Sequence, residues 1–346
     1  MTSVLIFRRG SIGDAIVSIP ALNAIAHAHP GAERWILTNK PVMETAAAIE
    51  DVLKNSMLVQ GYINLPRGGG GWPQLKAAID QVRALKPDCL YYLSEPSGIL
   101  ARLKERAFFR LCGLRTVIGA PDAADTARYR PLGTGLWESE TDRLLRVIGA
   151  AESPDWTFAF TPPERQEADA VLADWAGRER YILFSLGAKL PDKDWGDSNW
   201  LRVLDQVSAA YPTLGLVAIG AQDESARTQR MLAAWRGPIL NLCGRTAPRI
   251  SALMGTRAAF YLGHDSGPMH LAALVGCPCV AIFSARAKPG VWFPRGDRNR
   301  IFYPWDAEPT VPARTGFRVA GNSIAAIAPE PVVAACLELL ATSAST

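Results

Sequence analysis

The sequence predicts an α/β protein with two doubly wound, Rossmann-like domains that face a central cleft. Short apolar runs of strand type alternate with helical segments along most of the chain, which is typical of parallel sheets covered by helices on both faces. The length of 346 residues exceeds what one hydrophobic core usually supports. The alternation lapses once, over residues 152–166, and then restarts. Because such sheets bind ligands at the carboxyl ends of their strands, we expect the functional residues in the loops there.

The first half contains five candidate strands, each an apolar run that ends in a polar or glycine-containing loop. These strands are residues 4–9, 34–39, 59–64, 89–94 and 116–120. Helical segments separate them, one beginning near residue 14 and others spanning roughly 41–53, 73–85 and 97–111. This half is therefore expected to form one parallel sheet.

The three prolines within residues 152–166 predict a linker. Beyond it, the candidate strands are 181–188, 215–220, 239–244, 258–263 and 279–284, again separated by helical segments. We assign an N-terminal domain to residues 1–155 and a C-terminal domain to residues 156–325. The helix within 326–346 is expected to pack back on the N-terminal domain.

The composition narrows the classes of protein. A four-residue apolar run followed by Arg8 and Arg9 has the wrong order and length for a signal peptide, so we expect a cytoplasmic protein. The formal net charge of +4 is too small to indicate a nucleic-acid partner, but it suits an acidic substrate or an anionic membrane surface. The six cysteines form no C-x-x-C pair, which favours buried thiols over a metal site.

The loop G-S-I-G-D at residues 10–14 lies between the first strand and the first helix. Its glycines are typical of a phosphate-binding loop, but a carboxylate at the helix opening would repel a diphosphate. Taken alone, Asp14 fits a helix cap. It also fits a general base, which removes a proton from a hydroxyl group.

A second polar loop, His264 to Gly267, joins an apolar strand to an apolar helix that begins near Pro268. This arrangement leaves the amides of Ser266 and Gly267 free to point at an anion, and His270 projects from the first helical turn. The alternative is a plain capped helix with Asp265 as its N-cap.

A third loop, in the segment L-F-S-L-G-A-K-L-P-D-K-D-W, contains Lys189 and Lys193. A lysine beyond the carboxyl end of a strand can neutralise a phosphate. Asp192, Lys193 and Asp194 also form a literal D-x-D, a spacing that can hold a divalent metal. Because the central lysine opposes a cation, we expect no metal here.

The three loops together resemble the ADP-heptose:lipopolysaccharide heptosyltransferase family, glycosyltransferase family 9 with the GT-B fold. The resemblance rests on G-S-I-G-D, K-D-W and H-D-S-G-P-M-H-L-A-A-L-V-G-C-P-C-V-A-I-F, which occur in order along nearly the whole chain. It implies inverting, metal-independent transfer of a sugar, a heptose or a related one, from a nucleotide-diphospho-sugar to a lipopolysaccharide-type or other surface glycan. The donor, which is ADP-heptose in that family, would be a substrate, and no cofactor is implied.

The resemblance also implies roles for individual residues. Asp14 matches the catalytic aspartate, with Ser11 and Gly13 shaping its acceptor loop. The residues implied to bind the donor phosphates or nucleotide are Lys193, Ser185, Gly187, Thr246, Asp265, Ser266, Gly267 and His270. The acid that contacts the donor ribose in the family is replaced by Gln222, with Glu224 close by.

Two further segments concern the acceptor. Arg102, Arg106 and Arg110 recur at helical spacing, which fits either a solvated basic face or a surface that docks acidic sugars or phospholipid at the inner side of the cytoplasmic membrane. The glycines of residues 68–71 fit either a lid over the acceptor or a slack connection.

Two other classes of function are weighed against the transferase. A nicotinamide-dependent oxidoreductase would suit two Rossmann-like halves, but the first strand is not followed by G-x-G-x-x-G and the second lacks a ribose-binding acid at its end. A non-catalytic sugar-nucleotide-binding protein would share the fold and the donor loop.

Overall fold

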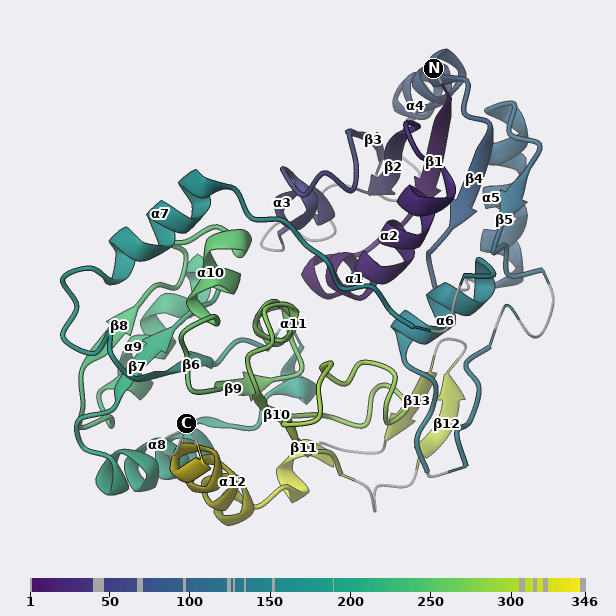
Figure 1. The fold of residues 1–346 in the computed structure, drawn as a ribbon. Helices are drawn as coiled ribbons and strands as arrows, with labels where there is room; N and C mark the ends of the chain where they lie inside the picture. The colour runs from purple at the N-terminus through teal and green to yellow at the C-terminus, as the bar shows by residue number, and fades with distance from the viewer. Residues whose placement is uncertain are drawn as a thin grey trace. The chain divides into compact units, whose positions relative to one another are not determined.

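The computed structural model describes residues 2–39, 47–66, 71–95, 98–122, 126, 128–133, 135–150, 153–188, 190–304, 309–313, 316–319 and 323–342. The chain divides into two compact units, Met1–Phe160 and Thr161–Thr346. The division falls a few residues beyond the predicted boundary at residue 155. Both units contain a parallel β-sheet with helical connections, as the alternating pattern predicts (Figure 1).

The N-terminal unit is built on a five-stranded parallel sheet in the order β3-β2-β1-β4-β5. Its strands are β1 (Ser3–Phe7), β2 (Glu33–Asn39), β3 (Gly61–Leu65), β4 (Cys89–Tyr92) and β5 (Val117–Ile118). Its helices are α1 (Ile12–Val17), α2 (Ile19–Ala28), α3 (Ile49–Leu53), α4 (Trp72–Leu85), α5 (Ile99–Leu111) and α6 (Glu140–Val147). Of the helix expected over residues 41–53, residues 41–46 lie outside the described part. The sheet order puts β1 at the centre, so the loop after β1 lies in the middle of the carboxyl edge.

The core of this unit includes apolar side chains from the sheet together with residues of α4 and α5. Leu5, Phe7 and Tyr92 from the sheet pack with Val82 of α4 and Phe109 of α5. Helices α4 and α5 therefore cover the same face of the sheet.

The C-terminal unit is built on a six-stranded parallel sheet in the order β11-β10-β9-β6-β7-β8. Its strands are β6 (Tyr181–Ser185), β7 (Gly215–Ala218), β8 (Ile239–Asn241), β9 (Tyr261–His264), β10 (Cys279–Ile282) and β11 (Arg300–Phe302), with a separate antiparallel pair, β12 (Pro309–Ala313) and β13 (Gly316–Val319). Its α-helices are α7 (Pro162–Leu172), α8 (Asp197–Ala210), α9 (Ser225–Leu232), α10 (Pro248–Met254), α11 (Gly267–Leu274) and α12 (Pro329–Thr342), and short 3-10 turns occur at η2 (Pro191–Lys193), η3 (Gln222–Glu224) and η4 (Ser323–Ala326). Strands β6 and β9 are neighbours, so the second and third loops of the sequence analysis meet at one edge.

The last helix corrects a prediction. We expected it on the N-terminal domain, but Val332, Cys336 and Leu340 of α12 are buried in the core of the C-terminal unit together with Trp200 and Leu204 of α8. The apolar residues of α12 recur every four residues and so form one continuous face, which covers α8 in its own unit.

The predicted linker at residues 152–166 is also partly wrong, because helix α7 begins inside it. Thr161 is the N-cap, its hydroxyl accepts the N–H of Glu164, and the Glu164 carboxylate accepts the Thr161 N–H at 2.8 Å. Pro162 and Pro163 occupy the first turn, where proline is tolerated because the N–H has no helical partner. These prolines therefore start a helix instead of breaking one.

All six cysteines are buried free thiols, as the spacing predicts. Among the described residues, no helix is both long enough and apolar enough to span a bilayer.

Candidate functional site

Asp14 lies just beyond the central strand β1, in the first turn of α1. Its Oδ2 accepts the N–H of Ser11 at 2.9 Å, so the carboxylate caps its own helix. The side chain is 24% exposed, which leaves it accessible to a substrate. The capping role is thus present in the structure, and the carboxylate is also positioned to act as a base.

Gly10 makes room for this carboxylate. Its φ is +137°, and a Cβ at this position would lie 2.0 Å from Asp14 Cγ. A side chain here would therefore displace the Asp14 carboxylate. The role of Gly10 was missed in the sequence, which drew attention to Ser11 and Gly13; Ser11 supplies the capped N–H, and Gly13 lies within α1.

We expect Gly10→Ala to impair activity and to destabilise the N-terminal unit by about 1–3 kcal/mol, because it adds both a steric overlap and backbone strain. Gly31→Ala is the matched control, since Gly31 also has a positive φ, +77°, but a Cβ there meets nothing within 4 Å. Activity and thermal unfolding of both variants check this. Equal losses would show that the Asp14 contact contributes nothing.

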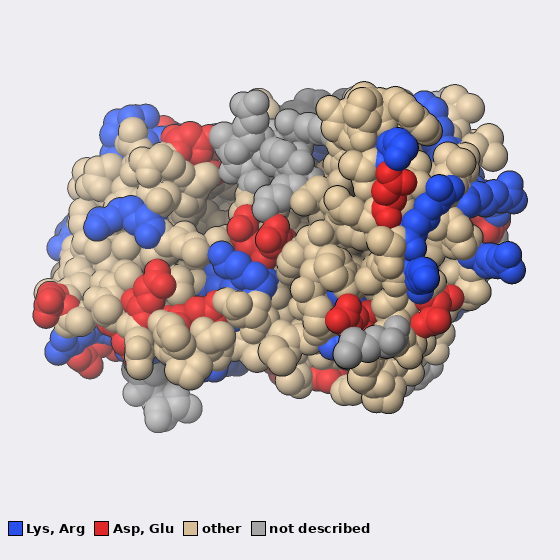
Figure 2. Space-filling model, turned by 90° about the horizontal axis from the view of Figure 1, so that it is seen from above, with Lys and Arg blue, Asp and Glu red and all other residues tan. Residues whose placement is uncertain are grey.

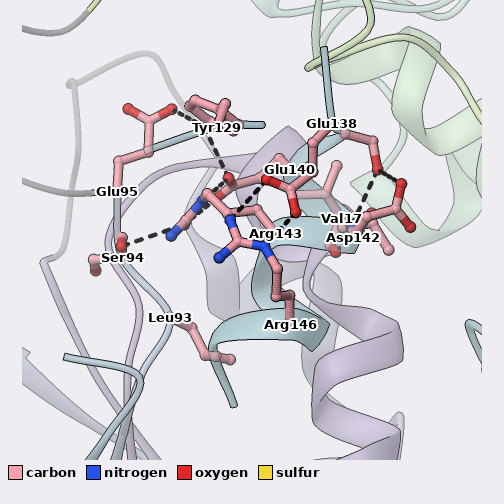
Figure 3. A network of polar contacts seen from close by, with 12 residues as sticks. Val17, Leu93, Ser94, Glu95, Tyr129, Glu138, Glu140, Asp142, Arg143 and Arg146 are labelled. Atoms are coloured by element: carbon pink, nitrogen blue, oxygen red, sulfur yellow. Dashed lines mark hydrogen bonds and ion pairs between the residues drawn. The ribbon is translucent and has the colours of Figure 1, made fainter. Parts of the chain in front are cut away.

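A buried network of charged residues surrounds Glu140 (Figure 3), and Arg8 connects it to Asp14. Arg8 at the end of β1 is 1% exposed, donates from Nη1 to Glu140 Oε1 at 2.8 Å and brings Nη2 to 3.4 Å from Asp14 Oδ1. Arg143 donates to both oxygens of Glu140, at 2.7 and 2.9 Å. The Tyr129 hydroxyl contacts Glu140 at 2.8 Å and Glu95 at 3.2 Å. Two arginines thus enclose the buried Glu140 carboxylate.

The network shifts the pKa values of Asp14 and Glu140 in opposite directions. Burial raises the pKa of Asp14, and Arg8 only partly offsets that effect. Burial alone would also raise the pKa of Glu140, but Arg143 and Arg8 hold it below its ordinary value. Glu140 therefore stays ionised, while Asp14 binds a proton more readily than an ordinary aspartate, which is favourable for a general base.

Sequence reasoning missed Arg8, Glu140 and Arg143, because charged residues are normally exposed and nothing in a single sequence marks them as buried. The sequence did contain a signal for the start of helix α6. Ser139 precedes the acidic first turn, and its hydroxyl accepts the Asp142 N–H at 3.1 Å as the N-cap.

In the C-terminal unit, the structure brings together two predicted site residues from different loops. Lys193 Nζ donates to Asp265 Oδ2 at 2.6 Å and to the Asp265 carbonyl at 3.2 Å. Lys193 follows β6 and Asp265 follows β9, the neighbouring strand. The pair therefore lies at the carboxyl edge of the sheet.

Helix α11 begins beside this pair. Ser266 is its N-cap, so the alternative with Asp265 as N-cap is wrong, and the Asp265 carboxylate pairs with Lys193 instead. The Ser266 hydroxyl donates to the His264 carbonyl at 3.3 Å. Pro268 has no N–H and the Met269 N–H donates to the Ser266 carbonyl at 3.1 Å, so the Gly267 N–H is the first-turn amide of α11 that suits an anion.

Two buried histidines flank the loop. His264 donates from Nδ1 to the Leu186 carbonyl at 3.1 Å and accepts the Trp195 N–H at Nε2, 3.0 Å away, so it joins the ends of β6 and β9. The ring of His270 packs edge-on against Trp292. Burial lowers the pKa of both His264 and His270 to about 4, so both rings are neutral near pH 7.

The D-x-D carboxylates are each held by an arginine. Asp192 pairs with Arg286, and Asp194 accepts two hydrogen bonds from Arg227 at 2.6 and 3.1 Å. Within the described ranges, no group of three or more His, Cys, Asp or Glu side chains is arranged to hold a metal ion.

Glu224 lies close against the backbone at the ends of β6 and β7. A Cβ on Gly187 would lie 2.0 Å from its Oε1, and one on Gly220 2.3 Å from its Oε2. Gln222 packs in the same way against Gly244. Glu224, and not Gln222, therefore lies beside the predicted donor residue Gly187.

The other predicted residues are placed as follows. Thr246 lies before α10 and its hydroxyl pairs with that of Ser251 at 2.8 Å. Ser185 ends β6 and is fully buried. Lys189 and the glycines at 68–70 lie outside the described residues, so the alternatives for that glycine loop stay as stated.

The predicted basic face on α5 is modified by local contacts. Arg102 donates to the Pro121 carbonyl at 2.6 Å, and Arg106 forms an ion pair with Asp122 at 2.6 Å. Arg110 is exposed. The three arginines therefore do not form a uniform docking surface.

Comparison with known proteins identifies the relationship. The sequence profile of "Glycosyltransferase family 9 (heptosyltransferase)" matches residues 144–314, which contain Lys193, Asp265 and α11. The matched part of the chain, residues 144–314, belongs to glycosyltransferase family 9. Family 9 membership thus confirms the predicted resemblance, and the match lies in the part that contains the donor loops.

Two Escherichia coli relatives named lipopolysaccharide heptosyltransferase 3 are similar to this chain. One is 25% identical over 158 residues, which is 45% of this chain and 46% of the relative. The other is 27% identical over 123 residues, 35% of this chain and 34% of the relative. The matched segments thus span less than half of each relative's length.

Solved structures show the same fold over the whole chain. A glycosyl transferase family 9 from Veillonella parvula has a TM-score of 0.74 at 15% identity, covering 99% of this chain and 98% of that one. The E. coli ADP-heptose heptosyltransferase II has a TM-score of 0.70 at 17% identity, with 99% of both chains covered. These likenesses confirm the GT-B fold class.

Proposed function

We propose that this chain is an inverting, metal-independent glycosyltransferase that moves a sugar, a heptose or a related one, from a nucleotide-diphospho-sugar to a lipopolysaccharide-type glycan or other acidic glycolipid. The observation that carries the proposal is that one chain contains both family 9 donor loops and an accessible Asp14 whose pKa is raised by burial. The acceptor chemistry is assigned to the N-terminal unit and donor binding to the C-terminal unit.

In the proposed reaction, an acceptor hydroxyl oxygen forms a bond to the anomeric carbon while the bond from that carbon to the diphosphate oxygen breaks. Asp14 takes the hydroxyl proton, and the nucleoside diphosphate leaves with the electron pair. Attack opposite the leaving group inverts the anomeric centre. Removal of the proton by a positioned base typically contributes about 10²–10⁴-fold to such a step.

The diphosphate charge would be met by Lys193 and by the Gly267 N–H at the start of α11. Both groups are preorganised donors, which cost little reorganisation when charge develops on the leaving oxygen. One fold neighbour, E. coli heptosyltransferase WaaC, was solved with ADP; its TM-score is 0.65 at 16% identity. We propose ADP-heptose as the first donor to test, with Glu224 contacting the ribose in place of Gln222.

Metal independence is supported by the ion pairs of the D-x-D. Asp192 and Asp194 are each committed to an arginine, and Lys193 lies between them. A cation there would have to displace these arginines. The proposed enzyme needs no cofactor and works on the cytoplasmic side of the membrane that contains its glycolipid acceptor.

The test is incubation of the purified chain with ADP-, GDP-, UDP- and dTDP-sugars, with a glycolipid acceptor, and with EDTA in parallel. We expect transfer or slow donor hydrolysis with one donor, at a rate that EDTA leaves intact. Binding without turnover would instead indicate a sugar-nucleotide-binding protein. Loss of turnover with EDTA and its recovery with magnesium would contradict metal independence.

We expect Lys193→Ala to weaken donor binding by about 1.5–3 kcal/mol, because a charge-assisted contact to a phosphate is lost. Donor affinity measured by calorimetry or thermal shift checks this. Lys189→Ala is the comparison, with a smaller expected effect. Equal losses would show that Lys193 has no special role at the phosphate.

A further inference from the structure

Helix α5 has an apolar surface on its solvent side. Among the residues described, the large apolar side chains that are clearly exposed include four on this helix: Ile99 (68%), Leu100 (76%), Leu103 (56%) and Leu111 (46%). Only Phe109 of α5 is fully buried. In Figure 1, α5 lies along the outer edge of the N-terminal unit.

Helical geometry places these residues on one side. At about 100° per residue, Ile99, Leu103 and Ala107 form a row directed away from Phe109, which faces the sheet. Leu100 and Leu111 extend the row on one side. A surface helix normally presents polar residues on its solvent side. We call the five apolar residues on this side the outer stripe: Ile99, Leu100, Leu103, Ala107 and Leu111.

Basic side chains border the outer stripe. By the same geometry, Lys104 lies on one side of the row and Arg106 on the other, and Arg110 lies within the row, between the directions of Ile99 and Leu103. Lys104 and Arg110 form no ion pair with another described residue, whereas Arg106 pairs with Asp122. The acid of the helix, Glu105, faces inward, where it accepts from the Tyr92 hydroxyl at 2.8 Å and pairs with Arg9. The outward side is therefore apolar and positively charged.

We propose that the outer stripe of α5 docks on an anionic lipid bilayer, with its leucines and isoleucine in the headgroup region and Lys104 and Arg110 on lipid phosphates. An apolar face bordered by basic residues is the pattern of helices that lie in a membrane interface. Figure 2 shows basic side chains gathered on one side of the view, with a few acidic side chains among them. The inference deepens the proposed function, because a glycolipid acceptor would be embedded in such a surface.

The charges favour a bilayer over a second copy of the chain. In a two-fold dimer each patch faces itself, so Lys104 and Arg110 would approach the same basic residues of the other copy. Like charges placed across an interface are unfavourable. Anionic lipid headgroups complement the same residues.

The test is flotation of the full chain with vesicles of phosphatidylcholine alone or of equal parts phosphatidylglycerol and phosphatidylcholine. We expect binding to the anionic vesicles and a loss at high salt. Leu103→Glu should weaken partitioning at least tenfold, and Lys104→Gln with Arg110→Gln roughly 30-fold.

Matched controls separate this site from general surface effects. Leu132→Glu alters a leucine of the same unit with the same 56% exposure as Leu103, and Lys54→Gln with Lys86→Gln removes the same charge elsewhere; both should bind vesicles like the wild type. Equal losses in the controls, no vesicle binding, or a dimer abolished by Leu103→Glu would overturn the proposal. Vesicle binding does not need turnover, so loss of sugar transfer with intact flotation would count against the transferase alone.

Discussion

Replacing Asp14 by Asn is expected to lower turnover by roughly 10²–10⁴-fold, because the amide cannot accept a proton at neutral pH. The asparagine oxygen can still accept the Ser11 N–H, and Asn caps helices about as well as Asp. Donor affinity and melting temperature should therefore barely change. Initial rates, donor binding and thermal unfolding of the variant check this.

Asp14→Ala separates the two roles of this carboxylate. It removes the cap as well as the base, so it should cost about 1 kcal/mol of stability in addition to the lost turnover. In the wild type, the raised pKa of Asp14 predicts that turnover falls as the pH drops through a value above the ordinary aspartate range. An Asn variant with near wild-type turnover would show that Asp14 is only a cap.

Glu140→Gln is expected to lower the free energy of unfolding by about 3–5 kcal/mol, because it leaves the buried Arg8 and Arg143 without their shared counter-charge. Denaturant unfolding measures this loss. The control Asp80→Asn breaks the exposed Lys76–Asp80 pair of the same unit and should cost under about 1 kcal/mol.

The pH dependence of the free energy of unfolding gives a second measurement of the interaction of Glu140 with Arg8 and Arg143. Because the folded pKa of Glu140 lies below its ordinary value, its contribution is present above the ordinary carboxyl range and is lost as the pH falls through the lowered value. The gap in stability between wild type and Glu140→Gln should therefore narrow on acidification. A gap that is small at neutral pH would contradict the importance of the network.

The position of Lys193 beside Asp265 could be anticipated in part from the sequence. Each residue follows an apolar strand, and the carboxyl ends of parallel strands share an edge. The adjacency of β6 and β9, which are separated by β7 and β8 along the chain, could not be deduced from the pattern. The 2.6 Å contact between the two side chains is thus a finding of the structure.

The surroundings of Asp14 were much less predictable. Arg8 and Glu140 neutralise each other although they are 132 positions apart, and no local pattern encodes such pairing. Glu140 and Arg143 are three positions apart on α6, but that spacing is equally common on exposed helix faces and does not indicate burial. Helix α12 shows the same limit for packing, because its apolar face indicates burial without saying which core it joins. The linker predicted from the prolines in the first turn of α7 was partly wrong for another reason, since proline ends some helices and begins others.

The ion pair between Lys193 and Asp265 has a consequence for selectivity. If Lys193 binds the donor diphosphate as proposed, the Asp265 carboxylate, 2.6 Å from its Nζ, would compete with an incoming anion for the lysine. A small anion such as inorganic phosphate must displace this competitor and gains a single anchor in return. At the proposed donor site, a nucleoside diphosphate would bring several additional contacts with the same displacement, so this competition would favour ligands that are held at more than one point over small free anions.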